Sequence, residues 1–216
     1  MNRVFVLSPA DCNGLRAQWL LRKDSRADLA VRLRGSGATL GEVFSFLSAL
    51  YFRGKLAYAH AFAQPPSACP GILIITPNTG LVPHDLVIQG KQLRGYGRVP
   101  IHLKNRRYCC ALEQSAKRLA GAIGDDCEVV LLGSLATGKY LDILTPVFAS
   151  RLRVPAEFIG RGDMSRGGLL LRCARENREL DYIDAVILSA SLNKRSRMNK
   201  PIPRSLTGQA AIRKNL

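Results

Sequence analysis

The sequence predicts an α/β fold: a single layered domain with a mostly parallel central sheet flanked by helices, followed by a basic C-terminal tail. Short apolar runs of strand length alternate with longer segments of helical periodicity, as in α/β proteins. One run, residues 71–76, is apolar almost without a break, which is typical of a strand buried on both faces beside parallel neighbours. The chain has 216 residues, 47% of them hydrophobic, which suits one domain with a sizeable core.

The expected strands lie at residues 3–7, 71–76, 127–132, 154–159 and 182–188. Thr39 and Glu42 have the spacing of a capping box, so the longest helix is expected to follow Thr39 and to stop before Pro65. Other helices are expected at residues 15–22, 107–123, 137–152 and 169–176. Within the α/β domain of residues 1–190, residues 77–106 are rich in Gly and Pro and are expected to form an irregular basic insertion with one or two short strands.

The net charge of +16 is concentrated in two segments. Residues 86–112 contain six basic residues and no acidic one, and the tail, residues 191–216, contains seven basic residues and no acidic one. The rest of the chain is close to neutral, so the excess charge predicts a nucleic acid or nucleotide partner. The candidate nucleic-acid-binding residues are Lys91, Arg94, Arg98, Arg106, Arg107, Lys194, Arg195, Arg197 and Lys200.

Several classes of protein are not indicated. No run of roughly 18 uncharged apolar residues appears, so no membrane partner is expected. The first residues lack the layout of a signal peptide, and the six cysteines include no C-x2-C pair. We therefore expect reduced, mostly buried thiols in a cytoplasmic protein without a metal site, and the sequence points to no particular cofactor. Cys12, in a polar loop, is the thiol least expected to belong to the core.

Residues 133–140 match the phosphate-binding motif G-x-x-x-x-G-K but have Tyr140 where the motif requires Ser or Thr to hold Mg²⁺. Three interpretations remain open. The segment is a nucleoside triphosphatase loop, a turn without special function, or an anion site at a helix N-terminus assisted by Ser134, Thr137 and Lys139.

Residues 160–168 combine four glycines, two arginines, one carboxylate and one hydroxyl. Arg161 and Arg166 offer planar forks to phosphate, and Asp163 is the candidate acid–base residue. The alternative is a surface loop in which Asp163 caps the following helix. His84, beside Asp85, is the candidate for a second proton carrier.

Polar loops follow four of the expected strands, at residues 8–14, 77–83, 133–138 and 160–168. The carboxyl ends of parallel strands meet at one edge of a sheet, so these loops are expected to converge there. The candidate ligand-binding residues of this crevice are Ser8, Asn78, Ser134, Thr137, Lys139, Arg161 and Arg166, with Asp163 and His84 as the catalytic candidates.

Residues 8–10, 75–83, 133–137 and 160–168 together resemble a family of uncharacterised bacterial proteins. The resemblance covers about residues 1–185 and is most specific in residues 160–168. It implies a bacterial, cytoplasmic protein and assigns no role to any residue.

The sequence therefore predicts a protein that binds or processes a phosphate-bearing ligand, a nucleotide or nucleic acid, in a crevice at the carboxyl ends of the strands. The alternative is a non-catalytic nucleic-acid-binding protein that acts within a larger complex. The residues alone do not decide whether the protein is an enzyme.

Overall fold

The computed structural model describes residues 1–135 and 138–188. Four basic candidates of the tail, Lys194, Arg195, Arg197 and Lys200, lie outside the described residues, as does Thr137.

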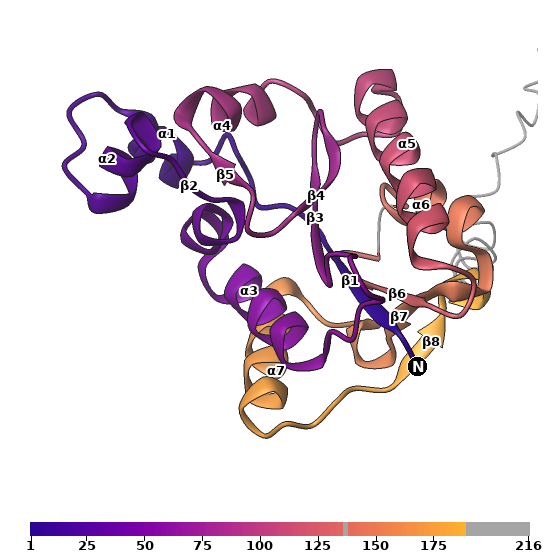
Figure 1. The fold of residues 1–216 in the computed structure, drawn as a ribbon. Helices are drawn as coiled ribbons and strands as arrows, with labels where there is room; N and C mark the ends of the chain where they lie inside the picture. The colour runs from indigo at the N-terminus through magenta and orange to yellow at the C-terminus, as the bar shows by residue number, and fades with distance from the viewer. Residues whose placement is uncertain (136–137, 189–216) are drawn as a thin grey trace, which may run out of the picture.

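A six-stranded sheet forms the centre of the protein and confirms the predicted fold class (Figure 1). Its order is β4-β3-β1-β6-β7-β8. The four inner strands run parallel: β1 (Arg3–Leu7), β3 (Ile72–Thr76), β6 (Glu128–Leu132) and β7 (Leu152–Pro155). The two edge strands, β4 (Gly80–Pro83) and β8 (Tyr182–Asp184), are antiparallel to their neighbours.

Helices cover both faces of the sheet (Figure 1). On one face lie α3 (Leu40–Phe62) and α7 (Asp163–Arg175), and on the other lie α5 (Arg106–Ile123) and α6 (Leu141–Phe148). Two short 3₁₀ helices, η1 (Ala149–Arg151) and η2 (Ala156–Phe158), flank β7. Every residue of β3 and β6 is buried, which explains why their sequences are apolar runs without polar alternation.

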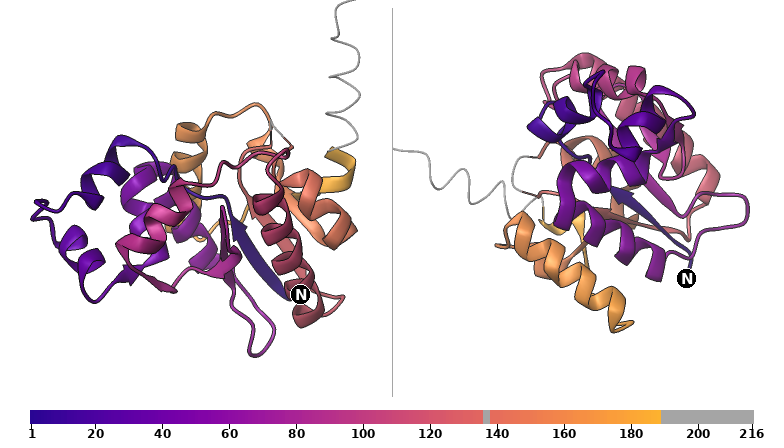
Figure 2. Two further views of the ribbon diagram at one scale, coloured as in Figure 1. Left: turned by 90° about the horizontal axis from the view of Figure 1, so that it is seen from above. Right: turned by 90° about the vertical axis from the view of Figure 1, so that its left-hand side faces the viewer.

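A small lobe stands beside the sheet (Figures 1 and 2). It contains α1 (Leu15–Leu21), α2 (Asp28–Arg34), α4 (Gly90–Gly97) and an antiparallel ribbon of β2 (Ala38–Thr39) and β5 (Val87–Ile88). Two separate stretches of chain build the lobe, one between β1 and α3 and the other after β4.

The structure corrects several of the predicted boundaries. The strand expected at 154–159 lies at Leu152–Pro155, because the next residues form η2, and the strand expected at 182–188 ends at Asp184. Residues 77–106 contain two short strands, β4 and β5, as expected of an irregular insertion. They also form helix α4, which was not predicted because glycines surround its capping box of Gln89 and Gln92. The helix expected at 137–152 is shorter, because α6 begins only at Leu141. The loop expected to last until residue 168 ends sooner, since α7 already begins at Asp163.

Helix α3 is continuous in sequence but sharply broken at Ala49, where φ is +44° and ψ is −117°. A non-glycine residue in this region costs about 1–3 kcal/mol, so the surrounding packing must hold it there. The break redirects the chain, and residues 50–62 then cover the sheet beside β1, ending where Gln64 pairs with Arg3. The second half of α3 thus spans the whole length of β1.

Glycines allow α3 and α7 to touch backbone to backbone. A Cβ placed on Gly54 would lie 2.5 Å from the carbonyl oxygen of Gly167, and one placed on Gly167 would lie 2.8 Å from the Cα of Tyr51. Two glycines in the first turns of α7 reduce its helix propensity. Gly167 is nevertheless required at this position, because no side chain fits between the helices.

We predict that Gly167→Ala unfolds at much lower urea concentration than the wild type, with a loss of several kcal/mol, because the added methyl collides with the backbone of α3. Gly168→Ala is the matched control, since a Cβ at that position meets nothing within 4 Å. The control is expected to be about 0.5–1 kcal/mol more stable than the wild type, the usual gain from alanine in a helix. Equal stability of the two variants would contradict the close helix contact.

Candidate functional site

The order of the parallel strands identifies the place where a ligand is expected. Strands β1 and β6 are neighbours, yet the chain leaves β1 toward α3 on one face and leaves β6 toward α6 on the other. Open α/β sheets bind ligands outside the carboxyl ends of the strands at such a switch point. The residues that follow Leu7 and Leu132 are therefore the first to consider.

Ser8 and Lys55 are joined at this switch point. The Lys55 Nζ donates to the Ser8 carbonyl oxygen at 2.5 Å and to the Ser8 Oγ at 2.9 Å. The backbone N–H of Ser8 donates to the Leu132 carbonyl oxygen and continues the pairing of β1 with β6. Gly133 leaves room for this arrangement, because a Cβ on it would lie 3.0 Å from the Ser8 Cβ.

The Lys55 ammonium is enclosed in an unusual environment. The residue is 1% exposed, and its Nζ lies 4.6 Å from the centre of the Tyr51 ring and 4.7 Å from that of Phe52. No carboxylate of the described residues lies within ion-pair distance of it. Burial therefore lowers the pKa of Lys55 to about 7, although the more distant charge of Asp163 acts in the opposite direction.

Arg166 is the other buried basic side chain among the described residues, at 6% exposed. One of its terminal nitrogens donates to the Phe158 carbonyl oxygen at 2.8 Å, and the other lies 3.4 Å from a carboxylate oxygen of Asp163. Its Nε is buried without a hydrogen-bond partner, and so is the hydroxyl of Tyr51, which lies in the electrostatic field of the same guanidinium. The Tyr51 hydroxyl and the Arg166 guanidinium are thus close enough to interact, although neither the hydroxyl nor the Nε makes a well-formed hydrogen bond.

Asp163 stands at the rim of this cluster, with 62% of its side chain exposed. It occupies the first turn of α7 and accepts from Arg166. We call Ser8, Tyr51, Lys55, Asp163 and Arg166 the inner cluster. It contains two buried basic side chains, of which Arg166 is always charged and Lys55 is charged below about pH 7, and its one carboxylate is exposed to solvent.

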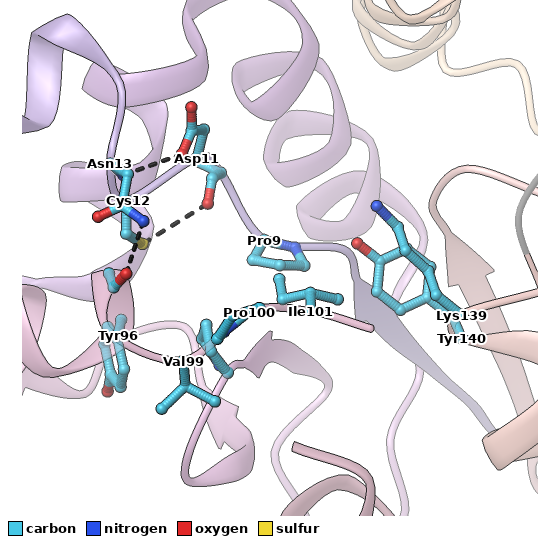
Figure 3. Close-up of a pocket in the computed structure, with 13 residues that line it drawn as sticks. Pro9, Asp11, Cys12, Asn13, Tyr96, Val99, Pro100, Ile101, Lys139 and Tyr140 are labelled. Atoms are coloured by element: carbon cyan, nitrogen blue, oxygen red, sulfur yellow. Dashed lines mark hydrogen bonds between the residues drawn. The ribbon is translucent and has the colours of Figure 1, made fainter. Parts of the chain in front are cut away.

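A cavity of about 290 Å³ lies at the same edge of the sheet (Figure 3). No residue of the inner cluster lines it, but its wall residue Tyr140 lies in the electrostatic field of Tyr51 and Asp163. In Figure 3, Lys139 and Tyr140 lie on one side of it and Cys12 and Asn13 on the other. The loop after β1 contributes Pro9 to its wall, directly after Ser8. The remaining lining comes from the loop after β1, the turn after β3 and the end of α4: Ala10, Asp11, Pro77, Tyr96, Gly97, Val99, Pro100 and Ile101.

Cys12 contributes its bulk to the cavity and not a reactive thiolate. It is buried, and its thiol donates to the Ala10 carbonyl oxygen. Burial and the nearby Asp11 carboxylate raise the pKa of the Cys12 thiol to about 12. The thiol therefore stays protonated near neutral pH.

The structure brings some of the predicted ligand-binding residues together at this edge. Ser8 and Arg166 belong to the inner cluster, with the predicted acid–base residue Asp163, and Lys139 lines the cavity with its Nζ 5.2 Å from the centre of the Tyr140 ring. Ser134 is half-buried just after β6.

Two predicted residues lie aside from the inner cluster. Asn78 is half-buried, accepts from the Thr79 hydroxyl and lies near Gly95 of α4. Arg161 is exposed and donates to the Ser165 hydroxyl. Neither contributes to the wall of the cavity.

His84 lies at the opposite end of the sheet from Asp163. Its backbone N–H donates to the carbonyl oxygen of Ile72, the first residue of β3, and its ring packs edge-on against His60 at 4.7 Å. The separation arises because β4 runs antiparallel to β3, which carries the end of β4 back to the amino edge. The structure thus does not bring together His84 and Asp163, the two residues predicted to share proton transfer.

Sequence reasoning missed Lys55 and Tyr51. Both lie in the second half of α3, where aromatic and small residues predominate and helical periodicity indicates a buried face. The available signal for Lys55 was that it is a lysine on the face of the helix that periodicity predicts to be buried. The sequence does not reveal its partner, because Ser8 lies 47 residues away.

Within the segment 133–140, the described residues 133–135 and 138–140 do not have the arrangement of a nucleotide-binding loop. Tyr140 is buried and precedes α6, so Lys139 also lies before the helix begins. The Asp142 carboxylate lies against Gly138, where a Cβ would meet it at 2.7 Å. A carboxylate at this helix N-terminus competes with phosphate, which disfavours the triphosphatase interpretation.

The described part of the chain shows neither a metal cluster nor a membrane span. No group of three His, Cys, Asp or Glu residues is arranged to hold a metal ion there. No helix there combines the length and the apolar character needed to cross a membrane.

We predict that Lys55→Met alters stability in a pH-dependent way. The folded protein holds the pKa of Lys55 near 7, below the ordinary value of 10.5, so the unfolded chain binds more protons between these values. The cost of burying the charge is fully present below pH 7 and disappears as the pH rises toward 10, by about 1.4 kcal/mol for each pH unit between the two pKa values. Relative to the wild type, the variant should therefore be favoured most at pH 6.

Urea unfolding of both proteins at pH 6 and pH 9 measures this effect. Comparing the difference between the two proteins at each pH removes the contributions of the other titrating groups. A difference that is the same at both pH values would show that Lys55 titrates normally.

Comparisons with protein-family models, curated proteins and solved structures gave no match to this chain, so the geometry at the carboxyl edge of the sheet carries the functional assignment.

Proposed function

We propose that the protein binds a phosphate-bearing ligand, a nucleotide or the end of a nucleic acid, at the carboxyl edge of the sheet over β1 and β6. The inner cluster would hold the phosphate, and the adjacent cavity would receive the group attached to it. Lys139 lines that cavity and would add a third positive charge next to the phosphate.

The observation that carries the proposal is the unbalanced buried charge. Elsewhere in this protein, the buried carboxylate Glu128 has two cationic partners, Arg3 at 3.0 Å and Arg153 at 3.1 Å. Lys55 and Arg166 have only the exposed Asp163 nearby, and the Arg166 Nε has no hydrogen-bond partner. Buried charges are normally paired, so an anionic ligand is the missing partner of this site.

Inorganic pyrophosphate and adenosine monophosphate are suitable first probes, measured by titration calorimetry at low, fixed salt. We expect both to bind the wild type, and Arg166→Met to lose at least tenfold in affinity, because a charge-assisted hydrogen bond contributes about 1.5–3 kcal/mol. Lys139→Ala tests the cavity wall and removes, besides the charge, only the contact of Lys139 with the Tyr140 ring; it is also expected to weaken binding.

Arg172→Met is the matched control, since Arg172 lies on the same helix, away from the inner cluster. It should bind as the wild type does. A wild type that binds neither probe, or Arg166 and Lys139 variants that bind both normally, would refute the proposal.

A second function, binding of nucleic acid along the surface, is favoured by a separate basic groove in the small lobe. The groove measures about 360 Å³ and is lined by four cations from three places in the chain: Lys23, Arg34, Lys91 and Arg94. No acidic residue lines it, and the nearby Asp24 is paired with Arg22. The predicted residues Arg98, Arg106 and Arg107 are exposed but lie outside this groove.

We expect Lys91→Glu combined with Arg94→Glu to weaken binding of a single-stranded RNA oligonucleotide, measured by fluorescence anisotropy over a range of salt concentrations. Each phosphate contact that is lost should reduce the slope of log K against log salt by about 0.7. Arg172→Glu with Arg175→Glu makes the same charge change on α7, outside the groove, and serves as the control. If both double variants lose affinity equally, the binding depends on net charge and not on the groove.

A further inference from the structure

We infer that Ser8 is a nucleophile and Lys55 its general base, and that the substrate is a phosphate ester that reacts at phosphorus. This inference rests on the proposed function, because it assigns a reaction to the same phosphate site.

The geometry of the two side chains is that of a nucleophile and a base. The Ser8 Oγ lies 2.9 Å from the Lys55 Nζ, a direct hydrogen bond across which a proton passes. The second contact of Nζ, to the Ser8 carbonyl oxygen, fixes the amine against the end of β1. Ser8 is therefore held in register with its base by the strand itself.

The environment of Lys55 favours the unprotonated amine. The side chain is fully buried between aromatic rings, and among the described residues the nearest charge of opposite sign is the exposed Asp163. A lysine near pH 7 is half deprotonated when its pKa is about 7, and only the neutral amine can accept the Ser8 proton. A lysine with a carboxylate partner would stay charged and would act only as a cation.

The position of Ser8 also fits a reacting group. It is the first residue after β1, at the switch point where substrates are expected, and the next residue, Pro9, lines the cavity. Ser8 itself is 5% exposed and packs closely against Gly133, on which a Cβ would stand 3.4 Å from the Ser8 Oγ, so substrate must reach the hydroxyl from the side of Pro9. The Arg166 Nε has no hydrogen-bond partner, although both terminal nitrogens of this side chain have protein partners, and Lys139 lines the cavity.

The reaction balances with water as the second substrate. The Ser8 Oγ forms a bond to phosphorus as the bond from phosphorus to the leaving alcohol oxygen breaks, while the Ser8 proton passes to Lys55 and from there to the leaving oxygen. A water molecule then gives its proton to Lys55 and its oxygen to phosphorus. The bond from phosphorus to Oγ breaks, and Lys55 returns the proton to Ser8.

A fluorophosphonate probe tests this step without knowledge of the natural substrate. The Ser8 Oγ displaces fluoride from phosphorus and forms a stable adduct, which intact mass measurement and peptide mapping locate. We expect one adduct on the wild type at Ser8, none on Ser8→Ala, and labelling at least 100-fold slower on Lys55→Met, the usual contribution of a general base. Ser150→Ala removes an exposed hydroxyl and should label as the wild type does.

Two further readouts separate a base from a structural cation. The labelling rate of the wild type should rise as the pH passes 7, with the titration of Lys55. Lys55→Met should fold cooperatively and still label slowly, so that loss of structure does not account for the result. Fast labelling of Lys55→Met, or a rate independent of pH between 6 and 8, would overturn the role of Lys55.

Pyrophosphate titration of the same preparations separates the two proposals. If pyrophosphate binds and no adduct forms at Ser8, the nucleophile is refuted while the phosphate site stands. If the adduct forms at Ser8 and neither pyrophosphate nor adenosine monophosphate binds, Ser8 stands as a nucleophile, but the phosphate-bearing ligand and the phosphate-ester substrate are refuted. If neither occurs, both proposals are wrong.

Discussion

The contact between the Lys55 ammonium and Ser8 is the interaction on which the rest of the site depends. It ties the carboxyl end of β1 to α3. The break of α3 at Ala49 lets its second half lie along β1, which makes this contact. The rest of the cluster depends on two further features: Gly54 lets α7 approach to backbone contact, and that approach brings Arg166 beside Tyr51. Each feature is costly alone, whether as backbone strain or as lost helix propensity, and together they place two cations at one end of the sheet.

The burial of these basic groups supports the proposed role of the inner cluster in binding an anion. A hydroxyl or an amide could donate to the Ser8 carbonyl oxygen without burying a charge. Glu128, by contrast, is a buried charge between strands, and it is paired with both Arg3 and Arg153. Natural proteins keep destabilising polar groups mainly where chemistry requires them. The inner cluster is the place in the described structure where this protein buries basic groups without balancing them.

The layered fold was predictable from the sequence because buried parallel strands such as residues 71–76 and 127–132 have a local apolar signature. The convergence of the loops then followed from the geometry of parallel sheets, which placed Ser8, Lys139, Asp163 and Arg166 at one edge. Lys55 was not predictable, since its importance comes from a contact across 47 residues and from burial that its own sequence neighbours do not reveal. His84 was misplaced for a related reason: the direction of β4 depends on the tight turn after Thr76, and an antiparallel edge strand sends the same residues to the far end of the sheet.

The charge of the substrate and the role of Lys55 constrain each other. An anion close to Lys55 stabilises its ammonium form and raises its pKa, which removes the neutral amine that a general base requires. A doubly charged phosphate monoester would do so more strongly than a phosphodiester, which carries a single negative charge. Arg166 and Lys139 limit this rise in the pKa of Lys55 only if they neutralise the phosphate before it reaches Lys55. Lys139 lines the cavity wall, so an entering phosphate would meet Lys139 before Lys55. A site whose buried lysine has no carboxylate partner is therefore better matched to diesters than to monoesters. Among phosphate-bearing ligands, this favours a linkage of the kind found in nucleic acid, in agreement with the basic groove on the adjoining lobe.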